Sequence, residues 1–139
     1  MGRTIQVLVI EHDRLNRVLL RGILENVGLQ VLDAPGDALG VRILRAAPCD
    51  LLITDLLLMQ TDGAQELHRW SQEFPELRII AMENNAAARK TRPMLQEEQQ
   101  EGQLRILVKP VFRLELLTAI QELFPDWQPD DAEWARHGL

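Results

Sequence analysis

The chain alternates short apolar runs with longer segments in which apolar residues recur every three or four positions. The runs are rich in valine, isoleucine and leucine, which is typical of strands buried on both faces. The predicted strands are residues 4–10, 29–32, 50–54, 78–82 and 104–108. Because strands that alternate with helices form a parallel sheet covered on both faces, we expect one α/β domain of five βα units.

The first predicted helix begins after Asp13, which can cap it, and ends at Gly28. Five of its apolar residues recur at helical spacing and are expected to face the core: Leu15, Val18, Leu19, Ile23 and Val27. In a second helix, residues 37–45, we expect Leu39, Ile43 and Leu44 to point inward. Further helices are predicted at residues 64–74, 93–101 and 112–124, with a polar stretch at residues 83–92 before the fourth.

The composition restricts the class of protein. The chain has 139 residues, of which 46% are hydrophobic and 26% charged, as in an ordinary globular domain. No apolar run approaches the roughly 20 residues of a membrane span, and the amino terminus does not read as a signal peptide. The net charge of −6 argues against a nucleic-acid partner. The lone Cys49 excludes an internal disulfide and fits a reducing compartment, so we expect a cytoplasmic protein without membrane contact.

The last fifteen residues differ in character from the rest. Residues 125–139 contain two prolines, four acidic residues and one arginine, together with Trp127 and Trp134. We therefore divide the chain into a domain, residues 1–124, and an acidic tail, residues 125–139, with no room for an output domain. The tail is either a frayed end with a short helix near residues 131–136 or a docking segment, since exposed tryptophans are costly unless they bury against something.

Polar side chains cluster where the predicted strands end. Glu11 and His12 follow the first strand, Asp55 the third and Glu83 the fourth, and Lys109 precedes a proline after the fifth. In open α/β sheets, ligands bind in the crevice beyond these carboxyl ends. Carboxylates there suit a hard cation such as Mg²⁺, and a lysine suits a phosphoryl group.

These segments resemble the receiver domain of response regulators in two-component signalling. The similar stretches are VLVIEHD, CDLLITDLLLMQTDG, RIIAM and LVKP, and the resemblance runs from residue 4 to residue 124. The shared pattern has three parts: an acidic cluster after the first strand, an aspartate after the third strand that is followed by an Asp-Gly pair, and a Lys-Pro pair after the fifth strand. It implies a flavodoxin-like fold with strand order 2-1-3-4-5.

The resemblance also implies a function. Asp55 would accept a phosphoryl group from a histidine kinase or phosphotransfer protein, and Lys109 would contact that group. Mg²⁺ would be held by Glu11, His12, Asp55 and the backbone carbonyl of Leu57. The protein would then signal by contact rather than by enzymatic turnover. The expected surface is built by the fourth helix, fifth strand and fifth helix, which would meet an unknown downstream protein or a second copy of the chain.

The sequence departs from the family pattern at several of these positions. Glu11 and His12 align with a pair of acids, so an imidazole replaces one carboxylate and should weaken Mg²⁺ binding. Glu83 aligns with a switch hydroxyl and Ile106 with a switch aromatic. The segment from Glu83 to Lys109 is longer than usual, which predicts a displaced fourth helix.

These departures leave three hypotheses open. The first is an atypical receiver that is phosphorylated on Asp55. The second is a phosphorylation-independent interaction module in which Glu83 pairs with Lys109 and takes the place of phosphate, although Glu83 is otherwise read most simply as a solvated loop residue. The third, weaker one is a transition-metal site made by Glu11, His12 and Asp55, since imidazole with carboxylates suits such ions.

Overall fold

The computed structural model describes residues 4–55 and 63–129, so the predicted role of Leu57 and most of the tail lie outside the described residues. The strands are β1 (Gln6–Ile10), β2 (Gln30–Ala34), β3 (Leu51–Asp55), β4 (Arg78–Glu83) and β5 (Leu104–Val108). The helices are α1 (Arg14–Asn26), α2 (Asp37–Ala46), α3 (Gly63–Glu73), α4 (Asn85–Met94), α5 (Gln96–Gln100) and α6 (Arg113–Leu123).

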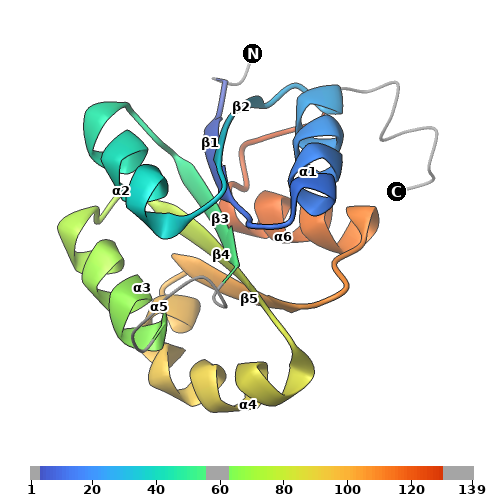
Figure 1. Cartoon of the computed structure of the whole chain (residues 1–139). Coiled ribbons are helices and arrows are strands. Elements are labelled where there is room, and N and C mark those ends of the chain that lie inside the picture. Colours follow the sequence, from blue (N-terminus) through green and yellow to red (C-terminus); the bar gives the residue numbers. More distant parts are fainter. Residues whose placement is uncertain (1–3, 56–62, 130–139) are drawn as a thin grey trace.

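The five strands form one sheet in the order β2-β1-β3-β4-β5, and every pairing is parallel (Figure 1). The central strand β3 is buried along its whole length, which accounts for the apolar run of its first three residues, although the strand ends in Thr54 and Asp55. The predicted flavodoxin-like α/β fold and its strand order are thereby confirmed.

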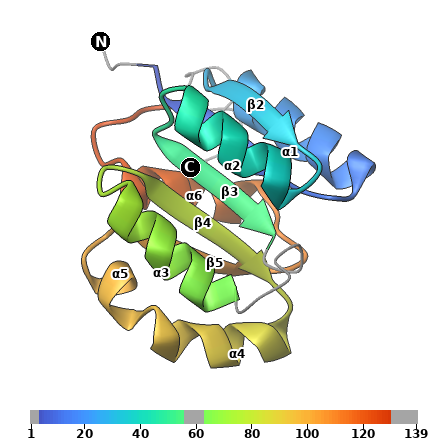
Figure 2. The same cartoon turned by 60° about the vertical axis from the view of Figure 1, so that its left-hand side comes forward.

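Helices cover both faces of the sheet (Figures 1 and 2). One core cluster joins the sheet to α1 and α6 and contains Leu20, Leu24, Leu116 and Ile120. The other joins it to α2, α3 and α4 and contains Leu44, Trp70 and Ala88. This two-layered core holds the strand ends, and therefore the polar residues that follow them, in fixed positions.

The buried side of α1 differs from the prediction. Leu15, Val18 and Leu19 are 65%, 57% and 55% exposed, whereas Leu20 and Leu24 are buried. The apolar arc of this helix is wider than the surface that the sheet can cover. Packing selects the side centred on Leu20 and Leu24, which are one turn apart. The expectation that Leu15, Val18 and Leu19 face the core was therefore wrong.

In α2 the helix lies very close to β1. Of the residues predicted to point inward, Leu44 is buried, Ile43 is partly buried and Leu39 is 44% exposed. Gly40 faces the sheet, and a Cβ atom placed on it would lie 2.3 Å from Cδ1 of Ile10. The absence of a side chain at Gly40 therefore permits this close packing.

The segment after β4 also differs from the prediction. We expected residues 83–92 to be irregular and a helix to begin at residue 93, but α4 already begins at Asn85. The side chain of Asn84 accepts a hydrogen bond of 2.8 Å from the Ala87 amide and caps the helix. The extra length of this segment is taken up by the short helix α5, so the predicted fifth helix corresponds to α6.

The described part of the predicted tail packs on the domain. Trp127 is 8% exposed and belongs to the core cluster beneath α1 and α6, and its backbone amide donates to Phe124. Pro129 is buried as well. The structured part of the domain thus extends beyond residue 124. Within the described residues, the structure contains no helix that is both long and apolar enough to cross a membrane.

Candidate functional site

The structure brings the predicted polar residues to one edge of the sheet. Asp55 is the last residue of β3, Glu83 is the last residue of β4, and Lys109 follows β5 directly. Glu11 and His12 follow β1, which lies beside β3. Neighbouring parallel strands end at the same edge, so residues far apart in sequence meet there.

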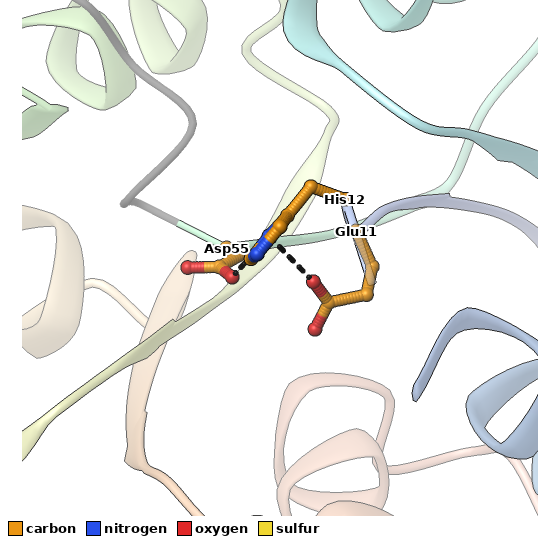
Figure 3. Close-up of side chains that lie close together, drawn as sticks. All are labelled: Glu11, His12 and Asp55. Atoms are coloured by element: carbon orange, nitrogen blue, oxygen red, sulfur yellow. Dashed lines mark ion pairs between the residues drawn. The ribbon is translucent and has the colours of Figure 1, made fainter. Parts of the chain in front are cut away.

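Three of these residues form a compact cluster (Figure 3). Nδ1 of His12 lies 3.1 Å from Oε2 of Glu11 and 3.3 Å from Oδ2 of Asp55. Both carboxylates are buried, while about half of the His12 side chain is exposed. The backbone amide of Asp13 also donates to Oε2 of Glu11, at 3.2 Å. The half-exposed imidazole therefore lies between the two carboxylates and the solvent.

Lys109 joins the same cluster. Its ammonium nitrogen lies 2.5 Å from Oδ2 of Asp55 and 3.5 Å from Oε1 of Glu11. Burial acts to lower the pKa of Lys109, but the hydrogen bond and negative charge of Asp55, with help from Glu11, outweigh it and raise the pKa above its ordinary value. The lysine therefore stays charged and orients the Asp55 carboxylate.

The donor set of this cluster fits a divalent cation. One ligand atom from each of Glu11, His12 and Asp55 lies within 4.8 Å of the other two. Two carboxylates against one ammonium leave an excess negative charge for a cation to neutralise. The carboxylate oxygens suit Mg²⁺, and the imidazole nitrogen adds a ligand that transition metals accept more readily.

Glu83 has a different environment from either of those predicted. Its side chain is 4% exposed, and its Oε1 accepts a hydrogen bond of 2.8 Å from the hydroxyl of Thr91 on α4. The contact between Glu83 and Lys109 is through the backbone alone: the Lys109 amide donates a hydrogen bond of 2.7 Å to the Glu83 carbonyl. Glu83 is thus no solvated loop residue, and its carboxylate forms no hydrogen bond or ion pair with the Lys109 ammonium among the described residues. Both interpretations were wrong.

The surroundings of the Glu83 carboxyl disfavour its charged form. Burial raises its pKa above the ordinary value, as does the negative charge of Asp55, while the Thr91 hydroxyl and Arg92 act in the opposite direction. Within the described part of the chain, its Oε2 is buried without a hydrogen-bond partner. The residue thus favours its neutral form more than an ordinary glutamate does.

Thr91 and Arg17 were not anticipated as parts of this site. Thr91 lies eight residues after Glu83, two turns into α4, and the pairing is visible from sequence only if α4 is known to begin at Asn85. Arg17 on α1 donates a hydrogen bond of 2.8 Å to the backbone carbonyl of Glu11 and so supports the loop after β1.

Ile106 lies in the middle of β5 and is buried in the cluster shared with α3 and α4. The position where a switch aromatic was expected therefore holds an aliphatic side chain inside the core. Because Ile106 is 5% exposed, moving its side chain into solvent would empty a packed site.

The chain matches the family described as "Response regulator receiver domain" over residues 7–121. It is 26% identical over 124 residues to the sensor histidine kinase GacS of Pseudomonas protegens, covering 86% of this chain and 13% of the kinase. The chain thus spans about an eighth of the length of that relative. It is also 31% identical over 130 residues to an uncharacterised 14.6 kDa protein of Leptolyngbya boryana, covering 89% of this chain and 93% of that protein.

Solved structures share the fold. A CheY-like receiver domain protein from Methanospirillum hungatei superposes with a TM-score of 0.74 at 20% identity, over 98% of this chain and all of that one. A receiver domain protein from Clostridium thermocellum has a TM-score of 0.73 at 24% identity, over 87% and 94%. These structures show that the fold is shared, and the family match over residues 7–121 shows that the chain belongs to the response regulator receiver domain family of two-component signalling.

Proposed function

We propose that the protein accepts a phosphoryl group on Asp55 and passes the signal on by protein–protein contact. The observation that carries this proposal is the position of Lys109, whose ammonium lies 2.5 Å from Oδ2 of Asp55. A fixed positive charge beside a strand-end carboxylate is suited to binding a phosphoryl group at that carboxylate. Glu11 and His12 also lie beside Asp55, and the three residues together could hold a cation.

In the proposed transfer, an oxygen of Asp55 attacks the phosphorus atom of the donor and a new phosphorus–oxygen bond forms. The bond from phosphorus to the leaving atom of the donor breaks, and the leaving group departs with the electron pair. Lys109 then moves from the carboxylate to the transferred group, whose charge it offsets. A bound Mg²⁺ would neutralise Glu11 and Asp55 and supply charge stabilisation to the phosphoryl oxygens.

The proposed donor is a histidine kinase or a phosphotransfer protein. The proposed output surface is formed by α4, β5 and α6. These elements correspond to the surface that the resemblance to the family implies. On it, a cavity of about 500 Å³ is lined by Leu107, Phe112 and Leu114 among others, and the last two are 67% and 48% exposed. Exposed apolar side chains of this size are suited to a protein contact, either with a downstream protein or with a second copy.

The test is phosphorylation of the intact chain by acetyl phosphate with Mg²⁺, followed by measurement of the protein's mass. We expect the added mass of one phosphoryl group in the wild type and in Asp33→Asn, a control that removes a carboxylate from β2. Asp55→Asn should remain unlabelled. A wild type that stays unlabelled with both acetyl phosphate and a histidine kinase, or an Asp55→Asn variant that is labelled, would contradict the proposal.

A second candidate function rests on Glu83. Its buried carboxylate is bonded to Thr91, so the strand-four switch position is already tied to α4 without a phosphoryl group. A phosphorylation-independent interaction module would have this property. Titration with beryllofluoride and Mg²⁺ separates the two functions, because saturable binding that Asp55→Asn abolishes supports the first, and absence of binding supports the second.

A further inference from the structure

The amino-terminal half of α1 carries an apolar surface that the rest of the described chain leaves uncovered. We call Leu15, Val18 and Leu19 the α1 patch. Each of the three side chains is more than half exposed. They lie within five residues of one another, so they form one continuous area rather than scattered single positions. Contiguous exposed apolar side chains usually mark a surface that is covered by something else.

A groove adjoins the α1 patch. It has a volume of about 550 Å³ and lies between α1 and the residues that lead from β5 into α6. Leu19 and Ile23 line it from one side, and Val111 and Phe112 line it from the other. Its volume is within the range of cavities that accept a ligand or a large side chain. An aromatic anchor could therefore enter beside the α1 patch.

The carboxyl-terminal segment begins close to this surface. Trp127 and Ile5 line one cavity, and the amide of Gln30, just after the end of α1, donates to the Ile5 carbonyl. The described chain thus ends near the carboxyl end of α1, which packs beside α6 on the same face (Figure 1). Leu19 lies about 12 Å along the helix from Val27. Trp134 is five residues beyond Pro129, and a stretch of that length spans up to about 17 Å.

The charges of the two segments are complementary. The helix carries Arg14, Arg17 and Arg21, of which Arg17 and Arg21 pair with Asp33 on β2 and Arg21 also pairs with Glu25. The positive charges still exceed these two negative charges by one. The segment of residues 130–139 carries three acidic residues, Asp130, Asp131 and Glu133, against one arginine, and it contains Trp134. Acidic residues are also favoured near the amino end of a helix, where the α1 patch lies. Reach, charge and the tryptophan all point to the same occupant.

We propose that residues 130–139 bind in cis to the α1 patch, with Trp134 as the apolar anchor. The segment then shields Leu15, Val18 and Leu19 from water and from other proteins. A partner that binds this end of α1 must displace it, so the segment acts as a built-in competitor. The inference does not depend on phosphorylation of Asp55.

The experiment is NMR spectroscopy of the intact chain, following the Trp134 indole signal and the α1 amide signals. Trp134→Ala identifies the indole signal and should shift the amides of Val18 and Leu19. Leu19→Ser should move the indole signal toward its position in a free peptide. The matched control is Leu114→Ser, which removes a similarly exposed leucine from α6 and should leave the signal in place. Neutralising Asp130, Asp131 and Glu133 together should also move the indole signal toward its position in a free peptide.

Two results would overturn the proposal. The first is an indole signal that already has its free-peptide position in the wild type, with α1 amides that do not respond to Trp134→Ala. The second is a shift that grows with protein concentration, which would mean that a second copy covers the α1 patch. Because all substituted positions are exposed or lie outside the described residues, circular dichroism should confirm that each variant remains folded.

Discussion

The hydroxyl of Thr91 on α4 donates a hydrogen bond of 2.8 Å to the buried carboxylate of Glu83 at the end of β4. The same hydroxyl lies 3.0 Å from the backbone carbonyl of Ala87, so it can satisfy one acceptor at a time. This contact joins the end of β4 directly to the helix that follows it. The resemblance implies a hydroxyl in place of the Glu83 carboxylate, so this contact is one of the departures from that pattern.

Thr91→Val should lower the free energy of unfolding by about 1–2 kcal/mol, because it leaves a buried acceptor without its donor. Thr91→Ser keeps the hydroxyl and should recover most of that loss. Urea unfolding of the three proteins at neutral pH measures the difference. Equal stability of the valine and wild-type proteins would mean that the hydrogen bond contributes nothing.

Glu83 should make the protein's stability depend on pH. The pKa of Glu83 is raised in the folded state, mainly by burial, so the folded chain holds this proton at pH values where the unfolded chain has lost it. The stability that this proton binding contributes is therefore fully present below the pKa of Glu83 in the unfolded chain. It is lost as pH rises through the pKa of Glu83 in the folded chain. Glu83→Gln removes this titration.

The measurement is urea unfolding of wild type and Glu83→Gln at a series of pH values from about 4 upward. As pH increases, the unfolding free energy of the wild type should fall relative to that of Glu83→Gln. A difference that is the same at every pH would show that the Glu83 carboxyl titrates alike in the folded and unfolded chains.

Lys109→Met should destabilise the protein by about 1–3 kcal/mol, because it leaves the buried carboxylates of Asp55 and Glu11 without their shared ammonium. Lys90→Met on the exposed face of α4 is the matched control and should change stability by less than about 0.5 kcal/mol. Adding Mg²⁺ should then raise the Tm of Lys109→Met more than that of Lys90→Met. Equal responses to Mg²⁺ would argue against a cation site between the two carboxylates.

Two helical glycines should respond to alanine in opposite ways. Gly40→Ala places a Cβ atom within 2.3 Å of Ile10, so it should cost about 1–3 kcal/mol. Gly22→Ala on α1 meets no atom within 4 Å and should stabilise the protein by about 0.5–1 kcal/mol through helix propensity. Thermal unfolding of both variants checks the pair, and a stabilising Gly40→Ala would contradict the close packing of α2 on β1.

Trp127→Ala should cost about 2–4 kcal/mol, because the indole is buried in the cluster beneath α1 and α6. Leu114→Ala, which removes a half-exposed side chain from α6, should cost less than about 1 kcal/mol. If the two variants unfold at the same urea concentration, Trp127 does not belong to the cooperative core.

The sequence was sufficient for the strands because burial on both faces demands short apolar runs, such as the first three residues of β3. It was also sufficient to bring Asp55 and Lys109 together, since both follow strands whose carboxyl ends meet. The buried side of α1 was not predictable, because apolar residues extend over more than one side of that helix. The start of α4 was missed because the segment as a whole is polar, although Asn84 is a capping residue and three alanines follow Asn85.

The partner of Glu83 was beyond a sequence argument for a different reason. A glutamate at a strand end can turn toward Lys109, toward solvent or toward the next helix, and only the position of α4 decides among them. Missing the first two turns of α4 therefore meant missing Thr91. The errors at α4 and at Glu83 have one cause.

The amino-terminal end of the described chain has a practical consequence. Thr4 precedes β1 and lies at the edge of the sheet opposite to Asp55 and Lys109. A linker attached before Thr4 would hold the molecule on a sensor surface by the end of the sheet that faces away from these two residues. Immobilised in this way, the protein would present the edge with Asp55 and Lys109 to a proposed partner in solution, and binding could be timed with the support on the opposite side.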